Sequence, residues 1–330
     1  MKNFTQPDGL FSIRIPLKWQ YANVAVGIAE SSPYSFQHYE NPSSAFQISC
    51  YPKSAHWSNK VPSQPANTDH LHFTQERMDD DKFHMRLWFA NVEDHYFMIK
   101  FIYDANKEDH PEILEELQHI ETSLATLQLL GGEECLRAVE FDVYEKFIAS
   151  LAASFDLRNK AIEHGCLIEL VIVIANQIDA YLRMCLVLHK QLEQKNERIE
   201  VALLRQGPSD RRFMEKEIYH MAADLEIIDQ QLLGNLVDLY EERNKVVHRY
   251  IISELRTRDL RQIAYEYFRL CDQVILRLKH FEDLQAQEKT GIYADRNPDR
   301  IPDELALNIL WSQINDKHLD KNLFRKFTDV

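Results

Sequence analysis

No two cysteines in this sequence lie at the close spacing that is typical of zinc sites and redox motifs. The five cysteines are odd in number, far apart and mostly in apolar segments: Cys50, Cys135, Cys166, Cys185 and Cys271. A disulfide framework or a cysteine-rich metal site is therefore not expected. The pattern favours reduced residues in the interior of a cytoplasmic protein.

The chain also lacks a long apolar run. Its N-terminus, Met1–Asp8, has no apolar segment of the kind found in signal peptides. The longest apolar stretch, Cys166–Ala175, is interrupted by Glu169 and is followed by polar side chains. A bilayer-spanning helix needs about 20 mostly apolar residues, so this stretch predicts a buried helix and no membrane association.

Positive charge is scarce, because the formal net charge is -14. A protein this acidic is not expected to coat nucleic acid along a broad surface, since phosphate contacts need local positive charge. The basic residues are nevertheless concentrated in one part of the sequence, around Arg243 and His248: Lys245, Arg249, Arg256, Arg258 and Arg261. This basic island, as we call those five residues, is compatible with a small RNA-facing cleft.

Glycine is rare, with 8 residues in 330, and Gly131-Gly132 is the one adjacent pair. Paired helix breakers favour a boundary at this point. We expect an α+β domain over residues 1–130, an all-α domain over 133–286 and a helical tail over 287–330.

Alternating apolar residues in the first part predict an antiparallel sheet. The expected strands cover residues 11–19, 46–50, 83–89 and 97–103, and the last two form a hairpin with a turn near Asn91–Asp94. An aperiodic loop is expected over Pro52–Asn67, and a closing helix begins at Pro111. The run Asp69-His70-Leu71-His72 has no third ligand in sight, so no metal site is predicted.

Beyond the glycine pair, apolar residues recur at helical spacing. Helices are expected over 133–157, 160–194 and 211–248, the last with a possible break near Leu225–Asp229, and from Thr257 to Phe281. Short links between long helices predict an up-and-down bundle. In the tail, a helix is expected from Pro302 to Trp311. The basic stretch Lys317–Lys326 could pack back on the bundle or contact RNA, and we favour packing on the bundle.

The segment ending the third of these helices contains Arg243, Asn244, His248 and Tyr250. Arg243 and His248 are separated by five residues, or about 140° on a helix, so one copy does not easily direct both at one target. A second copy across a two-fold axis would bring the two side chain types together, which predicts a homodimer. Such a cleft could cleave RNA without metal or cofactor, with His248 exchanging protons, Arg243 stabilising charge and Asn244 orienting the imidazole.

The stretch Arg243-Asn-Lys-Val-Val-His248-Arg-Tyr250 resembles the R-x4-H-x-Y signature of HEPN domains, which are helical modules. The resemblance implies a dimeric, metal-independent endoribonuclease of the toxin or anti-phage type, with Arg243 and His248 as the catalytic pair. It also implies that a nucleotidyltransferase antitoxin could modify Tyr250. Lys245, Arg249, Arg256 and Arg258 are then candidates for RNA binding.

The first 130 residues resemble the PsbP-like fold in the order of their strands and closing helix. The opening strand reads Phe-Ser-Ile-Arg-Ile-Pro-Leu-Lys-Trp19, and the closing helix ends in Glu-Thr-Ser-Leu124. That fold has no common active site, so the resemblance implies a recognition or scaffolding role.

Structural explanations compete with the catalytic one. Arg243 could pair with Glu242 or Glu254 at the surface, and His248 could stabilise the helix C-terminus. Asp179 could position Arg243, but its i+4 spacing favours a pair with Arg183. On this view the bundle is a non-catalytic dimerisation or protein-interaction scaffold.

Overall fold

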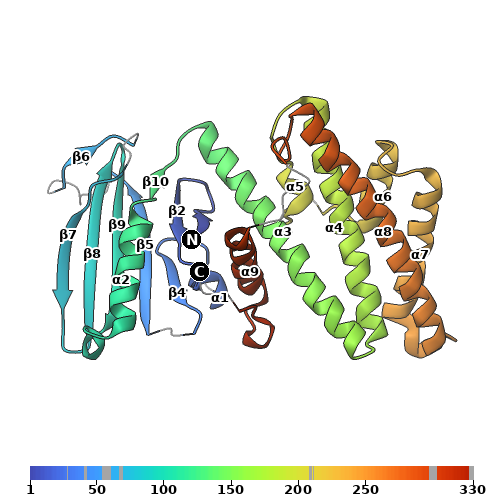
Figure 1. Ribbon diagram of the computed structural model, residues 1–330, viewed down its shortest axis with the longest axis horizontal. Coiled ribbons are helices and arrows are strands. Elements are labelled where there is room, and N and C mark those ends of the chain that lie inside the picture. The colour runs from blue at the N-terminus through green and yellow to red at the C-terminus, as the bar shows by residue number, and fades with distance from the viewer. Residues whose placement is uncertain are drawn as a thin grey trace. The chain divides into compact units, whose positions relative to one another are not determined.

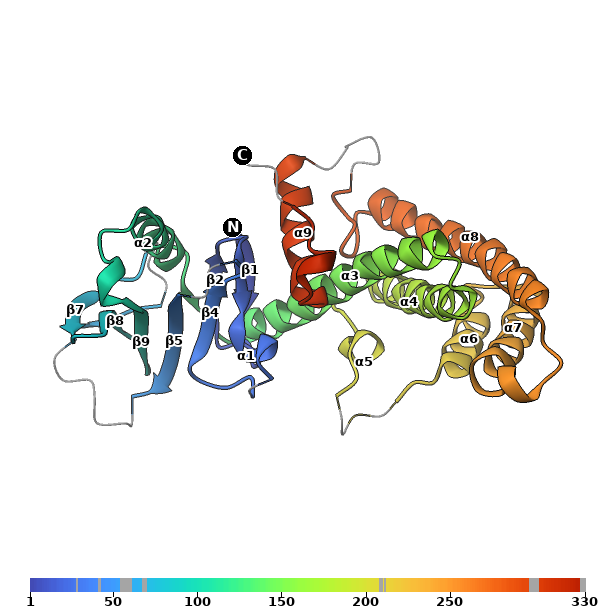
Figure 2. The same ribbon diagram turned by 90° about the horizontal axis from the view of Figure 1, so that it is seen from below.

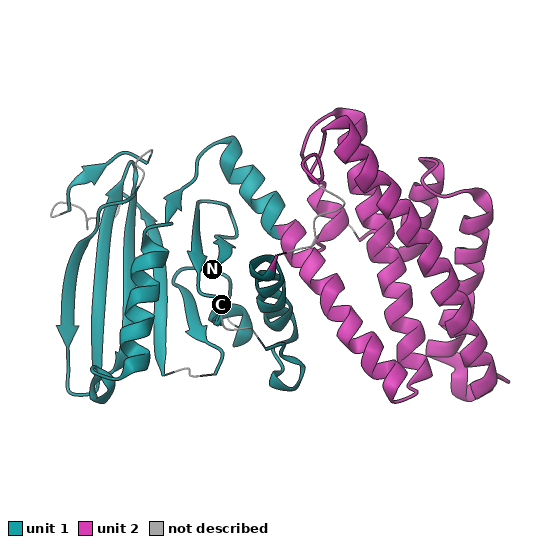
Figure 3. Cartoon of the chain, viewed as in Figure 1, with its two compact units in different colours: residues 1–142, 304–330 teal, residues 143–303 magenta. Residues whose placement is uncertain are grey.

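The computed structural model describes residues 1–27, 29–40, 43–53, 61–66, 70–207, 210, 212–296 and 303–326. The chain forms two compact units, Met1–Asp142 with Glu304–Val330 and Val143–Asp303 (Figure 3). The first is rich in strands and the second is helical, so the expected mixed α+β class with helices in the second half is observed.

The first unit contains two sheets. The smaller has the order β1-β2-β10 and the larger has the order β3-β4-β5-β9-β8-β6, with β7 also paired to β8. All of these pairings are antiparallel except that of β6 with β8. The strands are β1 Lys2–Thr5, β2 Phe11–Ile15, β3 Trp19–Tyr21, β4 Tyr34–His38, β5 Ser44–Pro52, β6 Ser63–Gln64, β7 Thr74–Asp79, β8 Phe83–Val92, β9 His95–Asp104 and β10 Gln128–Leu129.

The opening strand differs from the expectation, because residues 11–19 form two strands in different sheets. β2 ends at Ile15, and Trp19 starts β3 after a turn in which its N–H donates to the Pro16 carbonyl at 3.1 Å. Proline has no N–H to give to a ladder, so it ends the pairing at this point. The alternation survives the break, since Phe11, Ile13 and Trp19 are all buried.

The β8–β9 hairpin is confirmed, and β8 carries apolar side chains on both faces. Trp88 pairs with Ile99 and Ala90 pairs with Phe97, and these residues belong to the core. Met85, Leu87 and Phe89, whose alternation predicted the strand, therefore lie on the opposite face. The turn consists of Glu93 and Asp94, with Glu93 in the left-handed region at φ 48°.

A helix covers the core-facing side of the larger sheet in this unit (Figures 1 and 2). The helix α2 (Pro111–Leu124) begins at the predicted proline and buries Ile113, Ile120 and Leu124. These side chains pack in one cluster with Phe97, Ile99 and other residues of the sheet. The unit also contains α1 (Ala22–Ala25) and the short turn η1 (Ala105–Lys107).

The C-terminal helix α9 (Glu304–His318), followed by η3 (Lys321–Leu323), belongs to the first unit. The ammonium of Lys2, which is only 3% exposed, lies 2.5 Å from the Asp316 carboxylate, and the Tyr39 hydroxyl donates to the same carboxylate at 2.6 Å. The Ser312 hydroxyl donates to the Leu17 carbonyl at 2.6 Å. The expectation that the tail packs on the bundle is therefore corrected. Pro302, its predicted start, lies outside the described residues.

The second unit consists of the part of α3 (Glu133–Glu163) that follows Asp142, together with α4 (Leu167–Gln194), α5 (Val201–Leu204), α6 (Glu215–Asp224), α7 (Gln230–Arg249), η2 (Tyr250–Ile252) and α8 (Thr257–Glu288). Helix α4 contributes the largest share of the core, which it forms with side chains of α6, α7 and α8 (Figure 1). By length and composition α4 could cross a membrane, yet 78% of its apolar window is buried in the unit. Its apolar character is explained by this central position.

Most helix boundaries agree with the periodicity, including the predicted break. Helix α6 ends at Asp224, and Asp229 caps the start of α7 by accepting from the Leu232 N–H at 2.8 Å. The first boundary differs, because α3 continues to Glu163 and contains Lys160. The unit boundary also differs, since it falls inside α3 at Asp142 and not at Gly131-Gly132, where α3 begins.

Candidate functional site

The Arg243 side chain points into the helical unit and not into open solvent. Its guanidinium forms an ion pair with Glu215, at the start of α6, and both side chains are largely buried, at 17% and 15% exposure. The guanidinium also lies 4.8 Å from the centre of the Tyr240 ring, where a cation–π contact adds to the attraction. Of the two surface partners considered from sequence, neither Glu242 nor Glu254 is the observed one.

Glu215 is shared between two hydrogen-bond donors. Its second carboxylate oxygen accepts from the Tyr219 hydroxyl, one turn further along α6. Burial raises the pKa of Glu215 above its usual range, while the hydrogen bond from Tyr219 and the charge of Arg243 oppose that shift. This pair ties α6 to α7 beside the unit's core.

Asp179 forms the predicted pair with Arg183, at 2.6 Å on α4. Arg183 also donates to the carbonyls of Leu203 and Phe213, at 2.8 and 2.9 Å. Burial raises the pKa of Asp179, whose other carboxylate oxygen has no partner among the described residues. Arg183 therefore anchors the α4–α6 connection, and Asp179 holds Arg183. The pair with Arg183 is observed as expected.

His248 is exposed in the last turn of α7. Within the described parts of the chain it makes no hydrogen bond or ion pair, and a basic residue in this turn is favourable for the helix dipole. Asn244 lies one turn earlier and is half-buried. A single copy thus turns Arg243 inward and His248 outward, as their five-residue separation on a helix predicts.

The basic island is exposed but partly neutralised. The Lys245 ammonium lies 2.6 Å from Glu242, and the Arg258 guanidinium lies 3.4 Å from Asp259. Arg249 and Arg256 are also exposed. Exposed pairs are weak, worth about 0 to 1 kcal/mol, so these cations are available to a phosphate.

Large apolar side chains are exposed beside His248. Ile251 and Ile252 in η2 are 94% and 82% exposed, and Val247 in the preceding turn is 37% exposed. We call these three residues the apolar tip. Apolar side chains gathered next to one another on a surface are typical of interaction sites.

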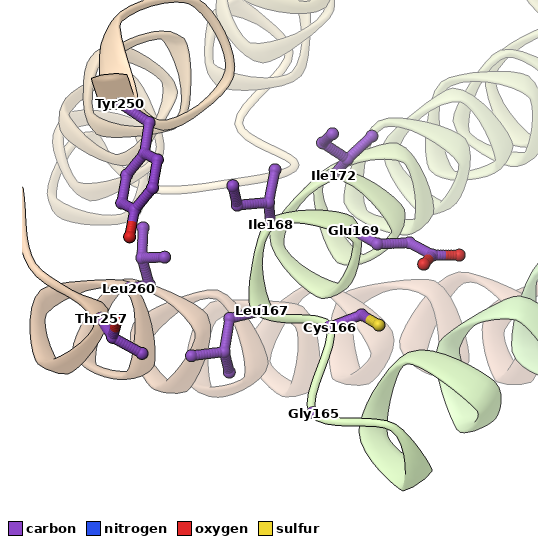
Figure 4. A pocket seen from close by; sticks show the side chains of 9 residues that line it. All are labelled: Gly165, Cys166, Leu167, Ile168, Glu169, Ile172, Tyr250, Thr257 and Leu260. Carbon is purple, nitrogen blue, oxygen red and sulfur yellow. The ribbon is translucent and has the colours of Figure 1, made fainter. Parts of the chain in front are cut away.

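Tyr250 turns the other way, towards a pocket of about 540 Å³ between the start of α4 and the α7–α8 connection (Figure 4). In Figure 4, Tyr250, Thr257 and Leu260 approach from one side and the segment 165–172 from the other. Tyr250 is half-buried and packs against the core of the unit. The sequence did not predict this pocket, because its walls come from segments about 80 residues apart.

Glu215 was also missed by the sequence analysis. Glu215 and Arg243 are 28 residues apart and lie on different helices, so helical periodicity cannot relate them. The sequence indicated only that Glu215 lies near the start of a helix. Across the described ranges, no group of three or more His, Cys, Asp or Glu side chains is arranged to hold a metal ion. His70 contacts the Ala125 carbonyl at 3.1 Å, and Asp69 lies outside the described residues.

Comparison with known proteins assigns no family. Neither a family model nor a curated protein matches the sequence. A crystal structure from Bacteroides thetaiotaomicron VPI-5482 aligns with 54% of this chain and 76% of its own, at 14% identity and a TM-score of 0.29. A similarity this low supports no conclusion about fold or function.

Proposed function

We propose that the helical unit is a metal-independent endoribonuclease that acts as a homodimer. The observation that carries the proposal is the exposed His248, set between the basic island and the apolar tip at the end of α7. An exposed imidazole near exposed cations provides both a proton carrier and sites for phosphate oxygens.

The reaction would be an internal transfer at phosphorus. An imidazole of His248 takes the proton of a ribose 2′-OH, and the 2′ oxygen attacks the adjacent phosphorus. The bond to the 5′ oxygen breaks as the His248 imidazolium so formed gives its proton to that oxygen. The products are a 2′,3′-cyclic phosphate and a 5′-hydroxyl. Arg243 is the proposed charge stabiliser, with Asn244 orienting the imidazole, and the cations Lys245, Arg249, Arg256 and Arg258 would hold the RNA backbone.

Homodimerisation follows from the same surface. Arg243 faces inward and His248 faces outward, so one copy offers an incomplete site. Burial of Ile251 and Ile252 against a second copy would remove an exposed apolar surface and bring two α7 ends together. The pair with Glu215 holds the Arg243 guanidinium inside the unit, so catalysis by Arg243 requires that pair to open.

The test is cleavage of a single-stranded RNA by purified protein in EDTA. His248→Ala is expected to lower the rate by about a hundredfold or more, the usual contribution of a general acid or base. His220→Ala, which alters an exposed histidine on α6, is the matched control and should retain activity. Ile251→Asp combined with Ile252→Asp should yield a monomer in sedimentation and abolish cleavage. Equal rates for wild type and His248→Ala would refute the proposal.

A second candidate function is supported by the Arg243–Glu215 pair. Because Glu215 neutralises the Arg243 guanidinium inside the unit, Arg243 has a structural role that needs no substrate. The second candidate is therefore a non-catalytic dimerisation or protein-interaction scaffold. The two candidates differ in one measurable respect, since a scaffold would dimerise through the apolar tip without releasing cyclic-phosphate ends.

The toxin or anti-phage role remains a proposal based on the motif resemblance, as does the PsbP-like recognition role of the first unit. A neighbouring nucleotidyltransferase would act on the Tyr250 hydroxyl. Mass spectrometry of co-expressed protein would reveal the added nucleotide on that residue, and an unmodified Tyr250 would contradict this part.

A further inference from the structure

The pocket beside Tyr250 has the chemical character of a small-molecule or base site. Its walls are mostly aliphatic, from Leu167, Ile168, Ile172 and Leu260, with the ring of Tyr250 and the hydroxyls of Tyr250 and Thr257. Gly165, Cys166 and Glu169 line the remainder, and the Glu169 carboxylate is directed away from Tyr250 (Figure 4). Binding pockets typically measure about 300–1,000 Å³ and combine apolar walls with a few polar groups. The volume of about 540 Å³ lies within that range.

Charge around the pocket distinguishes between possible occupants. Exposed Arg256 and Arg258 flank Thr257 in sequence, and exposed Arg249 precedes Tyr250. A purely aliphatic ligand has no anionic group that could interact with these cations. A nucleotide needs both features, because its base is a flat apolar surface with polar edges and its phosphate is an anion.

We propose that this pocket is a nucleobase subsite for single-stranded RNA. The inference rests on the proposed function, and it adds the part of the substrate that is recognised. A base would stack on the Tyr250 ring between aliphatic walls, with its edge near the two hydroxyls and its backbone towards Arg249, Arg256 and Arg258. Since Tyr250 follows His248 by two residues, the base that enters the pocket belongs to a nucleotide close to the scissile one.

A base inside a duplex cannot enter such a pocket, because its faces are already stacked and its edge is paired. The subsite therefore selects an unpaired nucleotide beside the cleavage position. Contacts of Arg249, Arg256 and Arg258 with the RNA backbone would contribute affinity without sequence preference.

The experiment measures binding and not cleavage, so His248→Ala protein is used throughout. A short fluorescent single-stranded RNA and an abasic ribose-phosphate chain of equal length are titrated by anisotropy. Ile168→Glu places a carboxylate in the pocket and should weaken binding of the RNA about tenfold or more, with little effect on the abasic chain. Ile162→Glu, at an exposed isoleucine outside the pocket lining, introduces the same charge and should bind as the parent does.

A second pair of variants tests the ring itself. Tyr250→Leu keeps an apolar residue against the core but removes the stacking surface, and it should weaken RNA binding in the same base-dependent way. Tyr265→Leu, at an exposed tyrosine of α8 outside the lining, is its control. Thermal unfolding by circular dichroism confirms that each variant is folded.

The outcomes separate this inference from the proposed function. Equal RNA affinity for Ile168→Glu, Tyr250→Leu and their controls would overturn the subsite, even if His248-dependent cleavage is observed. Base-dependent loss of affinity in both pocket variants would support the subsite, even if the wild type fails to cleave RNA.

Discussion

The Arg243–Glu215 pair is a residue-level feature with a large expected effect on stability. Both groups are largely buried, so removal of one partner leaves an uncompensated charge inside the unit. Glu215→Ala is therefore expected to lower the free energy of unfolding by about 3–5 kcal/mol. Urea unfolding followed by far-UV circular dichroism measures this, because the helices dominate that signal.

The matched control is the double variant Glu215→Leu with Arg243→Met, which replaces the pair by apolar side chains of similar size. Such replacements are often neutral or stabilising, so the double variant should be more stable than Glu215→Ala alone. A loss below about 1 kcal/mol for Glu215→Ala would show that the pair is solvated and weak.

Residue-level predictions from the sequence succeeded where both partners lie on one helix. The Asp179–Arg183 pair follows from i+4 spacing, and the opposite directions of Arg243 and His248 follow from their separation on α7. Glu215 could not be assigned to Arg243, since tertiary packing of α6 on α7 creates that pair. The same reason explains why the pocket at Tyr250 was not predicted.

At the scale of elements, the break between α6 and α7 depends on a side-chain cap. Asp229 accepts from the Leu232 N–H at 2.8 Å, and its carboxylate also lies 3.5 Å from Arg277. Asp229→Ala should lower the free energy of unfolding by about 1 kcal/mol, whereas Asp229→Asn keeps an oxygen acceptor and should cost much less. Equal losses for the two variants in urea unfolding would show that charge, and not the cap, is responsible.

Periodicity predicted the elements better than it predicted their faces. The long amphipathic helices and the β8–β9 hairpin were expected, and α2 begins at the predicted Pro111. In β8 both faces carry apolar residues, so alternation alone could not show that Trp88 and Ala90 face the core. Short strands such as β1 and β10 have too few residues to carry a pattern, and they form because the sheet offers them a partner.

At the scale of the whole molecule, residues 304–330 complete the first unit. A chain ending at Asp303 would lose Asp316, leaving the buried Lys2 ammonium without its anionic partner and Tyr39 without its carboxylate acceptor. We expect the truncated protein to lose stability in the first unit and to keep a folded helical unit, because residues 143–303 form a compact unit of their own.

Tryptophan fluorescence can follow the two units separately. The four tryptophans, Trp19, Trp57, Trp88 and Trp311, all lie outside residues 143–303. In the truncated chain the fluorescence transition should move to lower urea concentration while the helical circular dichroism transition stays in place. Asp316→Ala in the full-length chain is the milder test. It should lower the free energy of unfolding of the first unit by about 3 kcal/mol and so move the fluorescence transition to lower urea concentration. Equal shifts of the fluorescence and circular dichroism transitions would contradict the division of the chain into two separately unfolding units.

The discontinuous first unit also sets an order of events during synthesis. A ribosome releases residues 143–303 as one uninterrupted stretch, so the helical unit can fold on the nascent chain. The acid that neutralises Lys2 is made more than 300 residues after that lysine, as the separation of the pair shows. The β-rich unit therefore cannot complete its folding, with α9 in place, until translation has passed Asp316.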